Sequence, residues 1–249
     1  MENSRWAWRR WVIRGLGSAV SLLLVTGCAQ VTPTTGATAA QTVDPVSDAE
    51  TAADVYAACA TPGVVDYNPV SSLAALAQAS AVVVRGHIQR IEVGRTATLE
   101  GQIDHGVEVS SVIVVSDVTV VAGELEPDAD GNVYIEYKFV DPVAGDGVGN
   151  CAEALPEKTE IVAYLNPAWD GSAPPDEEEV DDRADYWMRI ADPSAGRPAG
   201  QALYSAAALE GLTWKLPGSG QVIWPLSLGF GPGDIRDTLP DGALMGPRA

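Results

Sequence analysis

Residues 81–93, AVVVRGHIQRIEV, decide the fold, because they read as a long strand that bends. Their apolar residues form two groups of opposite parity, with Val82, Val84 and Ile88 in the first and Ile91 and Val93 in the second. Alternate residues of a strand point to opposite faces, so this change of parity predicts a β-bulge. Gly86 is suited to a sharp bend, because glycine tolerates a close approach of neighbouring backbone.

Further β-rich segments follow in the chain. They span residues 107–121, 133–139, 161–165, 202–205, 209–215 and 222–226. The polar pair Ser116-Asp117 interrupts the first of them, and residues 127–132, PDADGN, have the composition of a hairpin turn. Ahead of these strands, Ser71 or Ser72 can cap a short helix that runs to about Ala79.

One short helix followed by six or seven strands, without alternating long helices, predicts an all-β fold. A bent first strand can contribute to both sides of a small closed or partly open barrel, and closure removes exposed strand edges. Residues 67–228 are expected to form this barrel domain. Residues 229–249 contain five Gly and three Pro, which predicts an irregular carboxy-terminal tail.

The first 30 residues are MENSRWAWRRWVIRGLGSAVSLLLVTGCAQ. A basic segment ends at Arg14, and the apolar stretch 16–25 is too short to span a bilayer core of about 30 Å. Residues 24–28, LVTGC, resemble the lipobox of bacterial lipoproteins. The resemblance implies that residues 1–27 are a signal peptide, that Cys28 is lipidated, and that the protein is held on the extracytoplasmic side of the cell membrane.

Two features of the same region remain expectations. The pair Arg9-Arg10 resembles a twin-arginine export motif, but Trp8 stands where Ser or Thr is usual, so the general secretion route is favoured. Residues 29–50 are rich in Thr and Ala and have no apolar period, which predicts a flexible tether. With residues 51–61 as a short Ala-rich helical turn, the lipid anchor and tether are expected to span residues 28–66.

The charge of the chain limits its partners. Its formal charge is −19. Four arginines and one glutamate give residues 1–27 a net charge of +3, which leaves −22 on the rest. Such a surface disfavours nucleic acid and anionic lipid headgroups, since both require Lys and Arg. It suits divalent cations or basic partners, although solubility alone also explains it.

Besides Cys28 the chain has Cys59 and Cys151. An even number of cysteines in an oxidising compartment favours a disulfide. The alternatives are two free thiols or a pair of metal ligands, and two cysteines with only two histidines make a poor zinc site.

Three segments together resemble the netrin-module, or TIMP-like, variant of the OB-fold barrel. They are residues 81–86 (AVVVRG), the long strand 112–123 that ends in glycine, and residues 150–156 (NCAEALP) leading into the strand 161–165. The resemblance implies an OB-like barrel in which the Cys of the loop before a short apolar strand is bridged to an earlier Cys. Inhibitors of that family chelate a protease metal through a free amino-terminal Cys. A lipidated Cys28 cannot do this, so that mechanism does not carry over.

Candidate catalytic residues are few. Histidine is the commonest general base at neutral pH, and the chain has only His87, within a strand, and His105, in a polar turn. No Gly-x-Ser-x-Gly elbow of the hydrolase type is present. A convergent site built from scattered residues needs no such motif, so an envelope hydrolase with a His-based site is an alternative function, and its catalytic residues stay unknown. There is no P-loop, dinucleotide motif or Cys pair at metal spacing, and we expect no cofactor.

A calcium-dependent module is a second alternative. Residues 126–131, EPDADG, resemble the start of an EF-hand loop, but Tyr137 occupies the position of its bidentate Glu, which favours a plain Asp-Gly turn and no metal site. The acidic segment 176–182, DEEEVDD, has carboxylates for loose Ca²⁺ binding, but uncaged carboxylates repel one another and stay hydrated.

Trp169 and Trp187 flank this acidic segment and are candidate ligand-binding residues, although core packing is the commoner use of tryptophan. The function predicted is that of a membrane-anchored, non-enzymatic module that binds an envelope protein or a glycan.

Overall fold

The described part of the chain is mainly β-sheet with few helices. The computed structural model describes residues 45–60, 69–101, 105–125, 131–140, 147–170, 186–226 and 229–245, which fall within one unit, Thr42–Ala249. The strands are β1 Val82–Gly101, β2 His105–Gly123, β3 Val133–Val140, β4 Glu160–Pro167, β5 Tyr186–Ile190, β6 Leu203–Ala206, β7 Leu212–Lys215, β8 Gln221–Trp224 and β9 Gly229–Pro232. The helices are α1 Pro45–Cys59, α2 Leu73–Ala79 and α3 Gly147–Ala154, with 3-10 turns η2 Leu209–Gly211 and η3 Ile235–Thr238.

Five of the strands form a closed ring. Strand β1 pairs with β2 and β4, β2 with β3, β3 with β6, and β6 with β4. The β3–β6 pair is parallel, and the other four pairs of the ring are antiparallel. Strands β7, β8 and β9 extend the sheet from β4, and β5 pairs with the far end of β1. The expected all-β class is therefore confirmed.

The bend expected at Gly86 is present. The pairing register between β1 and β2 shifts between Arg85 and His87, so β2 has one extra residue opposite Gly86. A second shift between Ile88 and Arg90 gives β1 one extra residue, which accounts for the change of parity. A Cβ atom at Gly86 would lie 2.6 Å from the Ser116 carbonyl oxygen, which makes any larger residue costly here. On β2 the bulge holds Asp117 at a φ of 53°, in the left-handed region.

Both faces of the ring strands are buried, which explains why the sequence alternates so poorly. Alternate residues of β4 belong to different apolar clusters: Ile161, Ala163 and Leu165 to one, and Val162 and Tyr164 to another. The first cluster contains Trp214 and the inward residues of the other ring strands, together with residues of α1 and α3. The second lies under α2 and η3.

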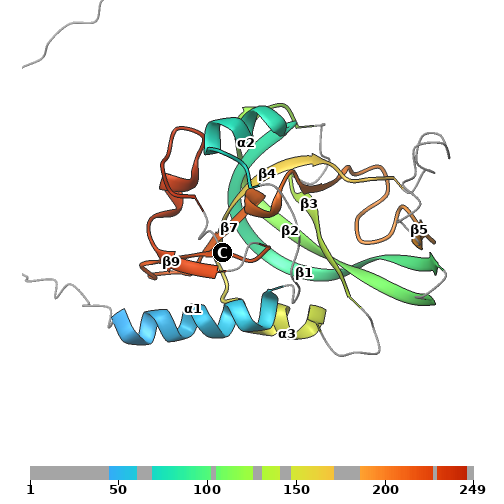
Figure 1. Ribbon diagram of the computed structural model, residues 1–249, viewed down its shortest axis with the longest axis horizontal. Helices are drawn as coiled ribbons and strands as arrows, with labels where there is room; N and C mark the ends of the chain where they lie inside the picture. The colour runs from blue at the N-terminus through green and yellow to red at the C-terminus, as the bar shows by residue number, and fades with distance from the viewer. Residues whose placement is uncertain are drawn as a thin grey trace, which may run out of the picture. The chain divides into compact units, whose positions relative to one another are not determined.

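Helices α1 and α3 are joined by the Cys59–Cys151 disulfide, with Cα atoms 4.6 Å apart and a sequence separation of 92. Figure 1 shows α3 at the carboxy-terminal end of α1, with α2 on the other side of the sheet. The Tyr137 hydroxyl of β3 donates a hydrogen bond to the Cys59 carbonyl at 2.5 Å. Burial raises the pKa of this phenol, which keeps it protonated as a donor. The disulfide and Tyr137 thus fix α1 to the ring.

Helix α2 begins as expected. The Ser72 hydroxyl accepts a hydrogen bond from the Ala75 amide at 3.1 Å, which satisfies one of the unpaired donors of the first turn. Leu73 and Leu76 are buried against the outer face of the sheet.

The structure differs from the sequence expectations in several places, one of which is a 3-10 turn at Leu209–Gly211 where a strand was expected to begin. Helix α1 begins at Pro45, inside the expected tether, and packs on the core. Helix α3 and strand β5 were not expected. Residues 229–245 form β9 and η3, where an irregular tail was expected. The tail is ordered because β9 pairs with β8 and Ile235 packs on Val83 and Tyr164. Cys28 and the rest of residues 1–44 lie outside the described residues.

Removal of the disulfide should destabilise the protein strongly. We expect the Cys59→Ala/Cys151→Ala double variant to lose about 2–5 kcal/mol of unfolding free energy, because the bridge restricts the unfolded chain across 92 residues. Both cysteines are buried, so the double variant is a cleaner test than reductant, and urea unfolding is the measurement. Unfolding midpoints that match the wild type would show that the bridge does not hold α1 to the ring.

Candidate functional site

The two candidate tryptophans belong to segments that meet along β1. The Trp169 carbonyl, two residues after β4, accepts a hydrogen bond from Arg95 Nη1 at 2.6 Å. Trp187 is in β5 and pairs through its backbone with Glu100 of β1, while its side chain lies outside the described residues. Of the three tryptophans whose side chains are described, Trp169 is 39% exposed and the other two are buried.

A buried ion pair lies beneath Trp169. The Arg95 guanidinium binds the Glu136 carboxylate of β3 through two parallel hydrogen bonds, of which Nε to Oε1 is 2.8 Å and the other joins Nη2 to Oε2. Arg95 is 2% exposed and Glu136 is 9% exposed. Such a bidentate pair fixes both side chains, and it orients the Trp169 backbone through the remaining Nη1 donor.

The pair is possible because β1 bulges at Gly94 and Arg95. The Arg95 amide donates to the Ser110 hydroxyl at 2.7 Å instead of continuing the ladder. A Cβ atom at Gly94 would lie 2.3 Å from the Ser110 hydroxyl oxygen, so glycine is required for this contact. The bulge turns the Arg95 side chain toward β3, where Glu136 receives it.

A second arginine lies in the segment that precedes β6. The Arg197 guanidinium donates from Nε to the Gln201 carbonyl at 2.6 Å and from Nη1 to the Pro193 carbonyl at 2.8 Å. Partial burial lowers the pKa of Arg197, and the positive charge of Arg95 lowers it further, although Glu136 and Asp192 act in the opposite direction. Two arginines are therefore close together in a protein that is otherwise strongly acidic.

This segment packs directly on the β1 bulge. Gly196 has a φ of +80°, and a Cβ atom there would lie 2.8 Å from the Gly94 Cα atom. Under it, Val112, Val114, Tyr134 and Leu203 form a small apolar cluster with Ala168 at its margin. We call the surface made by Trp169, Arg197 and the covered Arg95–Glu136 pair the Trp169 surface.

Sequence reasoning found Trp169 and missed Arg95, Glu136 and Arg197. Charged residues in a strand are predicted to face solvent unless the segment that buries them is known. The available signals were a Gly-Arg step inside an apolar strand and a Glu that shares its strand with Tyr134 and Ile135.

Of the two candidate histidines, only the side chain of His87 is described. His87 Nδ1 lies 3.5 Å from Asp117 Oδ2, with the imidazole 41% exposed, and among the described residues the ring has no hydrogen bond to a hydroxyl. The side chain of His105 lies outside the described residues. Within the described ranges, no hydrogen bond holds His87 Nδ1, whereas a catalytic base needs one to fix its ring.

The two candidate calcium segments, residues 126–130 and 176–182, also lie outside the described residues. Within the described ranges no cluster of three or more His, Cys, Asp or Glu side chains could hold a metal ion. No helix in those ranges is long and apolar enough to cross a membrane.

Comparison with known proteins gives no relative from which a function could be proposed. The chain matches no family profile, no curated protein sequence and no solved structure.

Loss of one partner of the buried ion pair should be costly. We expect Arg95→Met to lower the unfolding free energy by about 3–5 kcal/mol, because it leaves the Glu136 carboxylate buried without its partner. The double variant Arg95→Met/Glu136→Leu should recover most of this loss. Arg90→Met is the matched control, since the Arg90–Glu92 pair is half-exposed and worth less than about 1 kcal/mol. Equal losses from Arg95→Met and Arg90→Met in urea unfolding would refute the burial argument.

Proposed function

We propose that this protein is a lipid-anchored extracytoplasmic module that binds an envelope component, a protein or a glycan, through the Trp169 surface. The LVTGC motif at residues 24–28 supports the anchor, since it follows a basic segment and a short apolar stretch. The net charge of −19 makes nucleic acid an unsuitable ligand.

We further propose that the ring is an OB-like barrel. Its strand order β1-β2-β3-β6-β4, the parallel β3–β6 pair and the placement of α3 between β3 and β4 all support this assignment. The netrin-like resemblance gains support from Cys151, which precedes β4 and is bridged to the earlier Cys59. OB-like barrels serve many functions, so the function has to come from the site.

The observation that carries the binding proposal is the partly exposed Trp169 held on a rigid support. Its carbonyl is bound by Arg95, whose own position is fixed by Glu136 and Ser110. OB barrels bind ligands on strands 2 and 3 and on the loops after strands 1 and 4, and Trp169 belongs to the segment after β4. Tryptophan is enriched at binding surfaces because it offers a large contact area with one polar atom.

The anchor is tested by Cys28→Ala. Without the thiol no diacylglyceryl group can be attached, and we expect the protein to leave the membrane fraction or to remain uncleaved. Cell fractionation with intact-mass measurement distinguishes these outcomes. A fully cleaved Cys28→Ala protein that stays in the membrane fraction would contradict the lipobox assignment.

The Trp169 surface is tested with the full-length protein in intact envelopes. We expect chemical cross-linking to an envelope protein, or co-sedimentation with cell-wall glycan, to fall at least about tenfold in Trp169→Ala, which is the loss of a single binding hot spot. Val120→Ala serves as the control, because Val120 is similarly exposed but lies on β2 outside this surface. Retention of all cross-links and co-sedimentation by Trp169→Ala would refute the proposal.

A further inference from the structure

A hollow of about 360 Å³ lies between α1 and the turn that joins β7 to β8. The first turns of α1 contribute Ser47, Asp48 and Thr51 to its lining, and the turn contributes Leu216, Pro217 and Gly218. It shares no residue with the Trp169 surface. Next to the hollow, α1 is held by its buried residues Ala52 and Val55 and by the hydrogen bond between Asp48 and the Gly220 amide.

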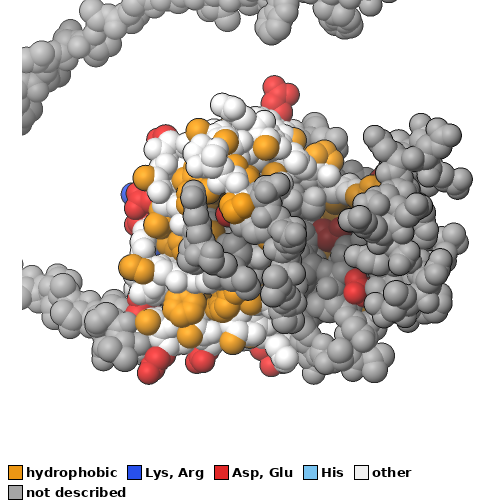
Figure 2. Space-filling model, in the orientation of Figure 1, with side chains coloured by type: hydrophobic (Ala, Val, Ile, Leu, Met, Phe, Trp, Pro, Cys, Tyr) orange, Lys and Arg blue, Asp and Glu red, His pale blue; other side chains and the backbone are white. Residues whose placement is uncertain are grey.

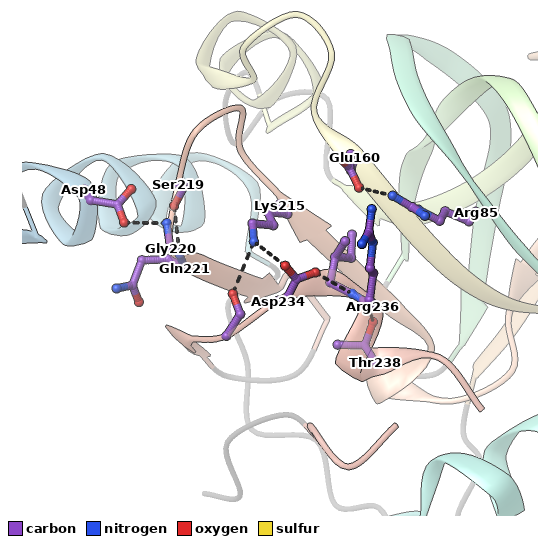
Figure 3. A network of polar contacts seen from close by, with 12 residues as sticks. Asp48, Arg85, Glu160, Lys215, Ser219, Gly220, Gln221, Asp234, Arg236 and Thr238 are labelled. Carbon is purple, nitrogen blue, oxygen red and sulfur yellow. Dashed lines mark hydrogen bonds and ion pairs between the residues drawn. The ribbon is translucent and has the colours of Figure 1, made fainter. Parts of the chain in front are cut away.

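One carboxylate is fixed within the lining. Asp48 Oδ2 accepts a hydrogen bond from the Gly220 amide at 2.8 Å, as Figure 3 shows. Among the described residues, no donor is bound to its other oxygen, Oδ1. The Thr51 hydroxyl donates a hydrogen bond to the Ser47 carbonyl at 2.9 Å. The hollow therefore offers a positioned acceptor with formal negative charge.

The charged side chains around the hollow favour a cation and oppose the partial positive charge of the amino-terminal end of α1. None of its described lining residues is Lys or Arg, and α1 carries Glu50 and Asp54 at exposed positions. Figure 2 shows carboxylates along the α1 edge of the molecule. The nearest cations in sequence are Lys158, which is exposed beside Glu157, and Lys215, which is paired with Asp234 at 3.4 Å (Figure 3).

Apart from Gly218 and Ser219 of the turn, the remaining lining residues are apolar. Leu216 and Pro217 line one side, and Pro156, from the segment after α3, lines another. A lysine or arginine side chain combines an apolar stem of three or four methylene groups with a charged head, so it suits a hollow with apolar walls and one carboxylate. A net charge of −19 would also attract a basic partner before contact.

We propose that this hollow binds a single lysine or arginine side chain from a basic segment of a partner protein, with the stem against Leu216 and Pro217 and the head at Asp48. The site is additional to the Trp169 surface, and neither depends on the other.

The test uses short capped peptides and the full-length ¹⁵N-labelled protein in detergent. The probes are Gly-Gly-Lys-Gly-Gly, its Arg counterpart and a norleucine counterpart that keeps the stem without the charge. We expect the basic peptides to shift the Gly218 and Gly220 amide resonances saturably and the norleucine peptide to leave them unchanged.

Two pairs of variants separate the hollow from diffuse attraction. Asp48→Asn keeps an acceptor for the Gly220 amide and should weaken peptide binding at least about tenfold. The control, Asp54→Asn, removes the same charge from an exposed site on α1 and should leave peptide binding unchanged. Gly218→Asn adds an uncharged side chain to a residue that lines the hollow and should also weaken binding. Its control is Gly200→Asn, because both glycines have positive φ and open space around the Cβ position, and Asn tolerates that backbone.

Three results would overturn the proposal. Equal weakening by Asp48→Asn and Asp54→Asn would show that attraction is diffuse. An equal response to the norleucine peptide would show that charge is not recognised. Saturable shifts of the same amides by N-acetylglucosamine, without any response to the basic peptides, would assign the hollow to a glycan.

Discussion

Strand β1 hydrogen-bonds with three other strands, and the rest of the structure depends on this. It pairs with β2 along most of its length, with β4 over Val82–His87, and with β5 over Ala97–Gly101. Between these two parts, the register of β1 with β2 shifts at Ile88–Arg90 and at the Gly94–Arg95 bulge, and another shift lies opposite Gly86, within the part paired with β4. A Cβ atom would clash at both Gly86 and Gly94. The ring and the Trp169 surface therefore have a common origin in the geometry of one strand.

Closure of the ring has consequences for packing and for the site. Strand β4 has buried residues on both faces, so each face must be covered by other elements. Helices α1 and α3 cover the apolar cluster on one face, and α2 and η3 cover the cluster on the other. On β2 and β3 the outer face is covered by the segment before β6, with Ala168 of the segment after β4 at its margin, and the charged pair Arg95–Glu136 lies beside this cover. A buried ion pair adds little net stability, but it fixes the arrangement of its two side chains, because moving one away would leave the other charge buried without a partner.

Much of this fold could be predicted from the sequence where the residues themselves dictate local geometry. The parity change after Gly86, the Ser72 cap and the two spare cysteines each correspond to an observed feature. Helix α3, GVGNCAEA, was missed because two glycines hide its helical character, and its position relies on the disulfide. Strands β5 and β9 exist because partners in β1 and β8 offer free edges, which no local pattern reveals. Arg95 and Glu136 were missed for the same reason, since burial comes from a segment far away in the chain.

The central claim is that a closed ring holds the Trp169 surface and fixes α1 beside the hollow. Ring closure depends on the parallel contact of Ile135 in β3 with Tyr204 in β6, together with the antiparallel contact of Val84 in β1 with Ala163 in β4. Cross-strand nuclear Overhauser effects measured in solution test both contacts at once. The account predicts that both sets are present and that these amides exchange slowly with solvent. Contacts between β1 and β4 without any between β3 and β6 would mean an open sheet and would contradict it.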